Sequence, residues 1–324
     1  MKYDVTVITP VFNGSAFLRE CIESVKRQVG VSVQHIVVDD GSTDGSYEVA
    51  AEYSCVTVLR QDNSGAPSAR NYGLRNALGS YIKFLDSDDV LVENCLKNQF
   101  EIFESSEDAK LIRYGYRDIV WEERRFLKKR VLECNLDGLQ CANNLTKQIA
   151  QRISKNILTS LPLYPAEVLQ NVGGFDLRLR SSQEWNLNIR IAAAGYYFKY
   201  DGVHCYTQRV HDNPLRITNR KVNPGNELAN DKYTYEVVSK YFVHLDVRKA
   251  WALRLWGKAS QFVRIGCLKE GKATFAAAER LADRSDIVRS FNPFHRSLIA
   301  IFGEIRVSLL FGVFHKSVRK FLYR

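Results

Sequence analysis

The sequence lacks the features that mark secreted, membrane-spanning and zinc-binding proteins. Its seven cysteines form no C-x-x-C pair and no metal-ligand spacing, and their odd number argues against a disulfide framework. The opening stretch, MKYDVTVITP, has a strand-like alternation and no apolar core of a signal peptide. No apolar run is long enough to span a bilayer. We therefore expect a cytoplasmic protein.

A dinucleotide-binding motif is also absent. Such a domain would place G-x-G-x-x-G directly after its first strand, where this chain has TPVFNGS. The sequence thus argues against a Rossmann dehydrogenase.

Charge is distributed unevenly along the 324 residues, whose formal net charge is +10. From Arg216 onward lie 21 of the 46 lysines and arginines but only 9 of the 36 acidic residues, which gives +12 there and −2 in the first 215 residues. This asymmetry indicates an anionic partner for the C-terminal part, and a membrane surface and nucleic acid are the candidates. A solvated basic helical surface explains the charge equally well.

The first hundred residues alternate strand-like and helix-like segments. The predicted strands are 5–9, 34–40, 55–60 and 80–86. Nearly continuous apolar strands separated by helices predict a parallel sheet covered on both faces, an α/β sandwich. Ligands of such sheets bind beyond the carboxyl ends of the strands, where Asp39, Asp40, Asp86 and Asp88 lie. Later segments predict strands at 111–120 and 157–165, a helix at 182–195, a return strand or hairpin at 196–210, and helices after Pro214.

The stretch SYIKFLDSDDV, residues 80–90, crowds three carboxylates at the end of a strand. On an extended chain Asp86 and Asp88, at i and i+2, point to the same face and can hold Mg²⁺ or Mn²⁺. A helix cap offers another explanation, in which Asp88 or Asp89 caps a helix that begins at Val90.

Four stretches occur in the order TPVFNGSAFLRECIESVKRQ, HIVVDDGSTDGS, NSGAPSARNYGLRNALGSYIKFLDSDD and GGFDLRLRSSQEW. Together they resemble the family 2 glycosyltransferases over about residues 4–212. The resemblance implies a GT-A α/β sandwich and transfer of a sugar from a nucleotide diphosphate, with inversion at the anomeric carbon. It implies a catalytic domain at 1–215, with a nucleotide-binding part at about 1–110 and an acceptor part at about 111–215, followed by a mainly helical basic extension at 216–324.

The resemblance also implies how the nucleotide is held. Pro10 and Phe12 would line the nucleotide entrance, and Asp40 would accept a hydrogen bond from the base, usually uracil. An Asx turn before Gly41 is the alternative role of Asp40. Arg70 would lie near the base and the carboxylates, with an arginine on the helix surface as its alternative.

The resemblance also assigns residues to the diphosphate and its metal. The resemblance implies that Asp86 contacts the ribose and that Asp88 binds the Mn²⁺ or Mg²⁺ that holds the diphosphate. His211 resembles a late histidine near the metal in relatives, although a hydrogen-bonded structural histidine fits as well. Arg209 is a candidate phosphate contact or the partner in a surface salt bridge.

Inverting transfer also needs a base on the acceptor side. In relatives this base is usually the aspartate of a Glu-Asp pair before an aromatic residue, and the matching stretch here is Gln183-Glu184-Trp185. Glu184 is therefore the expected catalytic base, with one methylene more than aspartate. The pattern Ser181-x-x-Glu184 also fits a capping box, and a catalytically impaired nucleotide-sugar-binding module is the alternative function.

Two further features complete the expectations. Gly173 and Gly174 are assigned to a tight loop near the donor sugar or to an ordinary turn. The tail 296–324 combines apolar residues with basic flanks, which predicts contact with an anionic membrane surface or packing on the catalytic domain. No nucleic acid partner is expected. The expected function is UDP-sugar transfer to a glycan or lipid-linked acceptor in surface polysaccharide biosynthesis, at the inner face of the plasma membrane.

Overall fold

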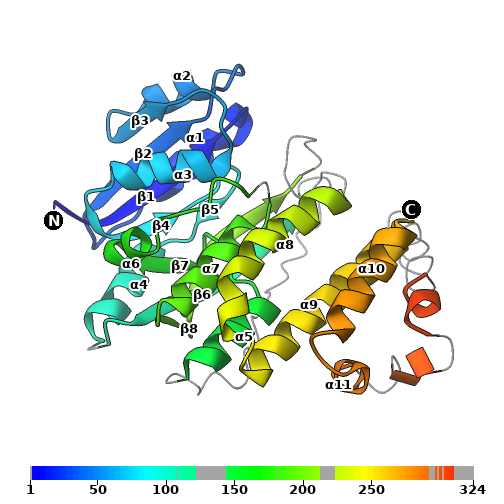
Figure 1. The fold of residues 1–324 in the computed structure, drawn as a ribbon. Coiled ribbons are helices and arrows are strands. Elements are labelled where there is room, and N and C mark those ends of the chain that lie inside the picture. Colours follow the sequence, from blue (N-terminus) through cyan, green and yellow to red (C-terminus); the bar gives the residue numbers. More distant parts are fainter. Residues whose placement is uncertain are drawn as a thin grey trace. The chain divides into compact units, whose positions relative to one another are not determined.

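A computed structural model gives the fold, and the residues that it describes are 2–106, 108–121, 144–179, 181–211, 223–291, 296–297, 299–300 and 303–309. The chain splits into two compact units (Figure 1). Unit 1 comprises residues 1–148 and 156–221, and unit 2 comprises residues 149–155 and 222–324.

Unit 1 begins with four parallel strands in the order β3-β2-β1-β4. They are β1 (Tyr3–Val11), β2 (Val33–Asp39), β3 (Val56–Arg60) and β4 (Gly79–Phe84). In the register of the two central pairs, Val5 faces Val33 on β2 and Tyr81 on β4. The prediction of a parallel sheet in this part of the chain is confirmed.

Helices cover both faces of these strands, as predicted. They are α1 (Ser15–Lys26), α2 (Ser46–Ala51) and α3 (Ala66–Arg75). Val37 of β2 joins the apolar cluster that contains α1 and α2, whereas its neighbour Val38 joins the cluster with α3. Adjacent strand residues point to opposite faces, so α3 lies across the sheet from the other two helices. Gly73 lets α3 approach closely, because a Cβ there would lie 2.5 Å from a methyl group of Ile8.

Four more strands extend the sheet to the order β3-β2-β1-β4-β7-β6-β8-β5. They are β5 (Val90–Leu91), β6 (Leu111–Trp121), β7 (Pro162–Pro165) and β8 (Tyr197–Val210). β7 is antiparallel to β4 and to β6, β8 is parallel to β6, and β5 is antiparallel to β8. This half of the sheet therefore mixes parallel and antiparallel pairs. Of the strand predicted at 157–165, only the last four residues form a strand, which is β7.

The helices between β5 and β8 are α4 (Cys95–Glu104), α5 (Leu145–Ser154), α6 (Ala166–Asn171) and α7 (Gln183–Ala193), and residues 149–154 of α5 belong to unit 2. The predicted helix at 182–195 corresponds to α7, whose apolar residues Leu187 and Ile191 are fully buried in the core of unit 1. This burial fixes the position of the start of α7, and hence of Gln183 and Glu184, relative to the sheet.

The described part of unit 2 after residue 222 is helical. Its elements are α8 (Pro224–Val238), η2 (Ser239–Tyr241), α9 (Leu245–Arg264), α10 (Leu268–Glu279) and α11 (Arg284–Arg289). α9 and α10 pack through Trp256 and Phe275, whose ring centroids lie 4.7 Å apart. Buried Lys258 of α9 pairs with Asp231 of α8 at 2.6 Å. Among the described helices, none combines the length and apolar character needed to cross a membrane.

Candidate active site

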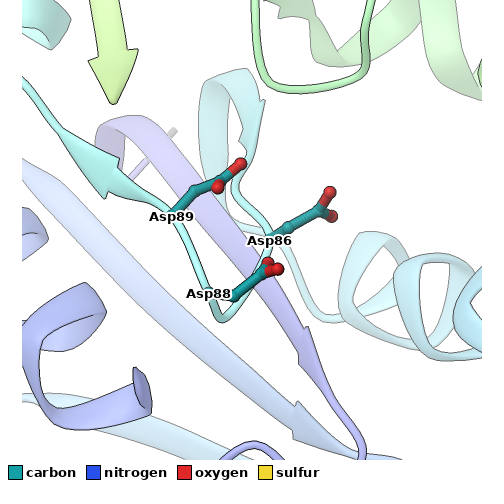
Figure 2. Close-up of side chains that lie close together, drawn as sticks. All are labelled: Asp86, Asp88 and Asp89. Carbon is teal, nitrogen blue, oxygen red and sulfur yellow. The ribbon is translucent and has the colours of Figure 1, made fainter. Parts of the chain in front are cut away.

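Three carboxylates meet in the turn between β4 and β5. The backbone N–H of Asp89 donates to the carbonyl oxygen of Asp86 at 3.0 Å, which closes the turn. One carboxylate oxygen from each of Asp86, Asp88 and Asp89 lies within 4.8 Å of the others. Figure 2 shows the three carboxylates projecting to the same side of the chain.

The turn corrects two sequence-based expectations. The segment is not extended, so the shared direction of Asp86 and Asp88 comes from the turn and not from strand alternation. Helix capping by Asp88 or Asp89 is wrong, because Val90 begins strand β5 and the next helix begins at Cys95.

These residues fit a hard divalent cation. Carboxylate oxygens are the ligands that Mg²⁺ and Mn²⁺ prefer, and one or two of them suffice when substrate phosphates complete the coordination. Asp89 is only 1% exposed, whereas Asp86 and Asp88 are half-buried and reachable from solvent. The oxygen of Asp89 also accepts a hydrogen bond from the backbone N–H of Arg209 at 3.2 Å, so Asp89 connects this turn to β8. A metal here would be held by Asp88 and its neighbours.

Arg70 of α3 connects the turn to α7. Its Nη2 donates to Asp86 Oδ1 at 2.7 Å and its Nη1 donates to Gln183 Oε1 at 3.1 Å. The guanidinium also lies over the ring of Phe175, 5.3 Å from the centroid. Because the Arg70 side chain is only 8% exposed, the alternative of a helix-surface arginine is wrong.

His211 lies beside the same turn. Its Nε2 is 3.1 Å from Asp88 Oδ2, and its ring stacks on Phe17 of α1 with centroids 4.5 Å apart. The imidazole can therefore orient Asp88 or take a place beside it in a metal site. The Arg209 side chain instead pairs with Glu20 at 2.5 Å and lies over Phe17, which matches the salt-bridge alternative. A phosphate contact of Arg209 stays a prediction.

Asp40, at the end of β2, fixes the loop that leads into α3. Its Oδ1 accepts from Gln61 Nε2 and from the backbone N–H of Ser64, both at 2.8 Å. Its Oδ2 accepts from the backbone N–H of Gly65, also at 2.8 Å. A carboxylate offers about four acceptor positions, of which three are used here, and Asp40 is only 3% exposed, so its contact with a nucleotide base stays a prediction.

The neighbouring turn belongs to Asp39. The backbone N–H of Ser42 donates to Asp39 Oδ1 at 3.0 Å, and Arg60 Nε lies 3.2 Å from Asp39 Oδ2. The loop before and after Gly41 is thus held by Asp39, through the N–H three residues on, whereas the Asp40 carboxylate bonds Gln61, Ser64 and Gly65 and forms no Asx turn. Pro10 lies half-buried on β1 and Phe12, just after it, is 40% exposed, so their role in a nucleotide entrance stays a prediction.

Glu184 occupies the first turn of α7. The helix has Ser182 as its N-cap, with a left-handed φ of 56° and no side-chain cap bond. The capping box of Ser181 with Glu184 is therefore wrong, because the helix begins one residue later than that pattern requires. The Glu184 carboxylate instead accepts a hydrogen bond from Asn156 Nδ2 at 2.8 Å.

Gly173 and Gly174 end helix α6. The N–H of Gly174 donates to the Leu169 carbonyl at 2.8 Å and the N–H of Gly173 to the Gln170 carbonyl at 3.0 Å, the two bonds of a Schellman motif. Both glycines have positive φ. The turn alternative accounts for them, and a contact with the donor sugar stays a prediction.

Three contributors to the site were not singled out from the sequence. Asn156 contacts Glu184, Phe17 stacks on His211, and Phe175 lies under Arg70. Asn71 of α3 holds Phe175 through a pair of hydrogen bonds to its backbone N–H and carbonyl, both at 2.8 Å. Phe17 and Phe175 lie within two of the stretches that resemble the family, which is the sequence signal that could have found them, whereas Asn156 lies in none of these stretches.

Comparisons with known proteins find similarity to glycosyltransferases. Residues 6–161 match the family described as Glycosyl transferase family 2. An uncharacterized glycosyltransferase of Rickettsia bellii is 29% identical over 230 residues, 70% of this chain and 32% of the relative. Glycosyltransferase GlyA of Streptococcus pneumoniae is 38% identical over 101 residues, 30% of this chain and 14% of the relative. The chain thus spans about a third or less of the length of the first curated relatives it matches.

Solved structures identify the fold. S. aureus TarS 1–349 in complex with UDP-GlcNAc superposes with a TM-score of 0.64 and 16% identity, over 97% of this chain and 92% of TarS 1–349. The mannosyltransferase PcManGT from Pyrobaculum calidifontis, in complex with GDP-Man and Mn²⁺, superposes with a TM-score of 0.52 and 17% identity, over 98% of this chain and 87% of PcManGT. The protein therefore has the GT-A fold, and its residues 6–161 match glycosyltransferase family 2.

Proposed function

We propose that this protein is a metal-dependent inverting glycosyltransferase that moves a sugar from a UDP-sugar to a hydroxyl group of a glycan or lipid-linked acceptor. The observation that carries the proposal is the chain of contacts Asp86–Arg70–Gln183, which runs from the carboxylate turn to the residue beside Glu184. This chain connects the carboxylates suited to a metal and diphosphate with a carboxylate suited to deprotonate an acceptor.

The donor is assigned to the carboxylate turn. Asp88 and its neighbour His211 hold the metal, Asp86 meets the ribose, and Asp40 receives the base. A bound Mg²⁺ or Mn²⁺ supplies stabilisation of the negative charge on the departing diphosphate. Support for a nucleotide-sugar and a divalent metal comes from TarS, solved with UDP-GlcNAc, and PcManGT, solved with GDP-Man and Mn²⁺.

The acceptor side is assigned to Glu184. Its carboxylate takes the proton of the acceptor hydroxyl while that oxygen bonds to the anomeric carbon, and the bond from this carbon to the diphosphate oxygen breaks with its electron pair leaving on the diphosphate. Attack from the side opposite the leaving group inverts the anomeric carbon. Arg70 supports both halves because it hydrogen-bonds residues on each side.

The wider setting is proposed on charge and on relatives. We assign catalysis to residues 1–215 and acceptor delivery to the basic region 216–324, whose segment 296–324 would meet anionic lipid at the inner face of the plasma membrane. Residues 298, 301–302 and 310–324 of that segment lie outside the described residues. Surface polysaccharide or lipid-linked glycan synthesis is the process that such an acceptor implies.

A donor panel tests the proposal. UDP-sugars are offered with Mn²⁺ to the wild type, to Glu184→Gln and to a matched control, Glu167→Gln, which changes an exposed glutamate at the same second position of helix α6. We expect the wild type and the control to release UDP, and Glu184→Gln to bind UDP with at least a hundredfold lower turnover. Wild-type protein that binds UDP-sugars without any turnover would instead indicate the impaired binding module.

A further inference from the structure

We infer that Asn156 is a positioning residue for catalysis, which holds the carboxylate of Glu184 so that one oxygen faces the acceptor hydroxyl. The inference rests on the proposed function, because it concerns the orientation of the proposed base. It assigns a role to a residue that lies outside every motif of the sequence.

The first observation is the hydrogen bond itself. Asn156 Nδ2 donates to Glu184 Oε1 at 2.8 Å, a short and well-formed contact. Among the described residues, no other hydrogen bond or ion pair of Glu184 is found. One carboxylate oxygen is thus anchored and the second is available to a substrate.

The second observation is that the chain directly after exposed Asn156 is held by a buried anchor. Asn188, one turn further along α7 and only 1% exposed, donates from its Nδ2 to the carbonyl oxygen of Ile157 at 2.7 Å. The hydroxyl of buried Tyr164 in turn donates to Asn188 Oδ1 at 3.1 Å. The segment that carries Asn156 is therefore fastened to the same face of α7 that carries Glu184, since residues four apart share a helix face.

The chemistry explains why such a partner is useful. Glutamate has one more rotatable bond than the aspartate that relatives use, so an untethered Glu184 would spread over several positions. A misplacement of about 1 Å can lower a rate on the order of a hundredfold. An amide donor fixes the carboxylate without placing a cation on it. Asn156 thus compensates for the additional methylene of Glu184.

The test separates positioning from a merely structural role. In Asn156→Ala we expect kcat to fall about 10- to 100-fold, with the donor KM and the UDP dissociation constant within about twofold of the wild type. Asn156→Asp, which has the same shape but no amide donor at that position, should lose as much or more. The matched control is Asn171→Ala, since exposed Asn171 also donates from its amide, to the hydroxyl of Tyr196 at 3.1 Å. It should retain wild-type kcat.

A double mutant completes the experiment. If Asn156 acts through Glu184, adding Asn156→Ala to Glu184→Gln lowers the residual rate no further, whereas independent effects would multiply. The inference is overturned if Asn156→Ala keeps wild-type kcat, if only KM changes, or if the two losses multiply. If Glu184→Gln is inactive and Asn156→Ala is fully active, only the inference about Asn156 is overturned. If the wild type itself is inactive, both this inference and the proposed function are overturned.

Discussion

Arg70 offers the sharpest test of how the two halves of the site are joined. Its buried guanidinium reaches Asp86 at 2.7 Å and Gln183 at 3.1 Å from two different nitrogens. Lysine carries a compact point charge and cannot span both acceptors, so Arg70→Lys should keep the charge while losing one contact. Arg70→Ala loses both contacts and the charge.

The magnitude follows from burial. Removing one partner of a fully buried pair costs about 3–5 kcal/mol, but the Asp86 side chain is 42% exposed and water can rehydrate its carboxylate. A hydrogen bond to a charged group contributes about 1.5–3 kcal/mol. We therefore expect Arg70→Ala to lower the free energy of unfolding of unit 1 by about 2 kcal/mol and Arg70→Lys by about 1 kcal/mol.

Urea unfolding of the metal-free protein, followed by circular dichroism, measures these changes. Arg75→Ala on the exposed side of the same helix is the control and should stay within about 0.5 kcal/mol of the wild type. A cycle with Asp86→Asn should show a coupling on the order of 1 kcal/mol. The reasoning is refuted if Arg70→Ala is as stable as the Arg75→Ala control, or if the cycle shows no coupling.

Further predictions concern the turn beside the site. Gly174→Ala should lower the free energy of unfolding in urea by about 2 kcal/mol, since φ is +65° and a Cβ would lie 2.5 Å from Asn71 Oδ1. Gly173→Ala, whose Cβ would have nothing within 4 Å, should lower it by only about 1 kcal/mol because of backbone strain. Equal losses in the two variants would contradict this reasoning. Hydrogen bonds from Arg178 lower the pKa of the Asp176 carboxyl below its ordinary value of 3.8, against an opposing effect of burial. The stability that this lowered pKa provides is complete above the ordinary pKa of 3.8 and is lost as the pH falls through the lowered pKa. Asp176→Asn should therefore lower the free energy of unfolding at pH 7 by less than about 1 kcal/mol, and should have no effect in strong acid. A pH-independent difference from the wild type would contradict it.

Much of the donor half of the fold was predictable from local patterns. Apolar runs marked the parallel strands, and the position of Asp86 and Asp88 after β4 followed from where such strands end. The mixed pairing further along could not be predicted, because β7 pairs antiparallel with β4 through residues about 80 positions away. No local pattern encodes such a register.

The candidate active site was also predictable only in part. The resemblance singled out Arg70 and Glu184, but the bond from Arg70 to Gln183 joins residues 113 positions apart, and the bond from Asn156 to Glu184 spans 28. Side chains that meet only after packing leave no spacing to detect. The two capping alternatives failed for a related reason: Val90 pairs with Thr207 of the distant strand β8, and the start of α7 depends on which residues its core-facing side can bury.

Calorimetry of UDP binding tests the central claim most directly. The account predicts that UDP binds the wild type at least tenfold more tightly with Mn²⁺ than with a chelator, and that Asp88→Asn abolishes this difference while leaving the folded protein intact. Equal affinity for UDP with and without Mn²⁺ in the wild type, or an unchanged metal effect in Asp88→Asn, would contradict it.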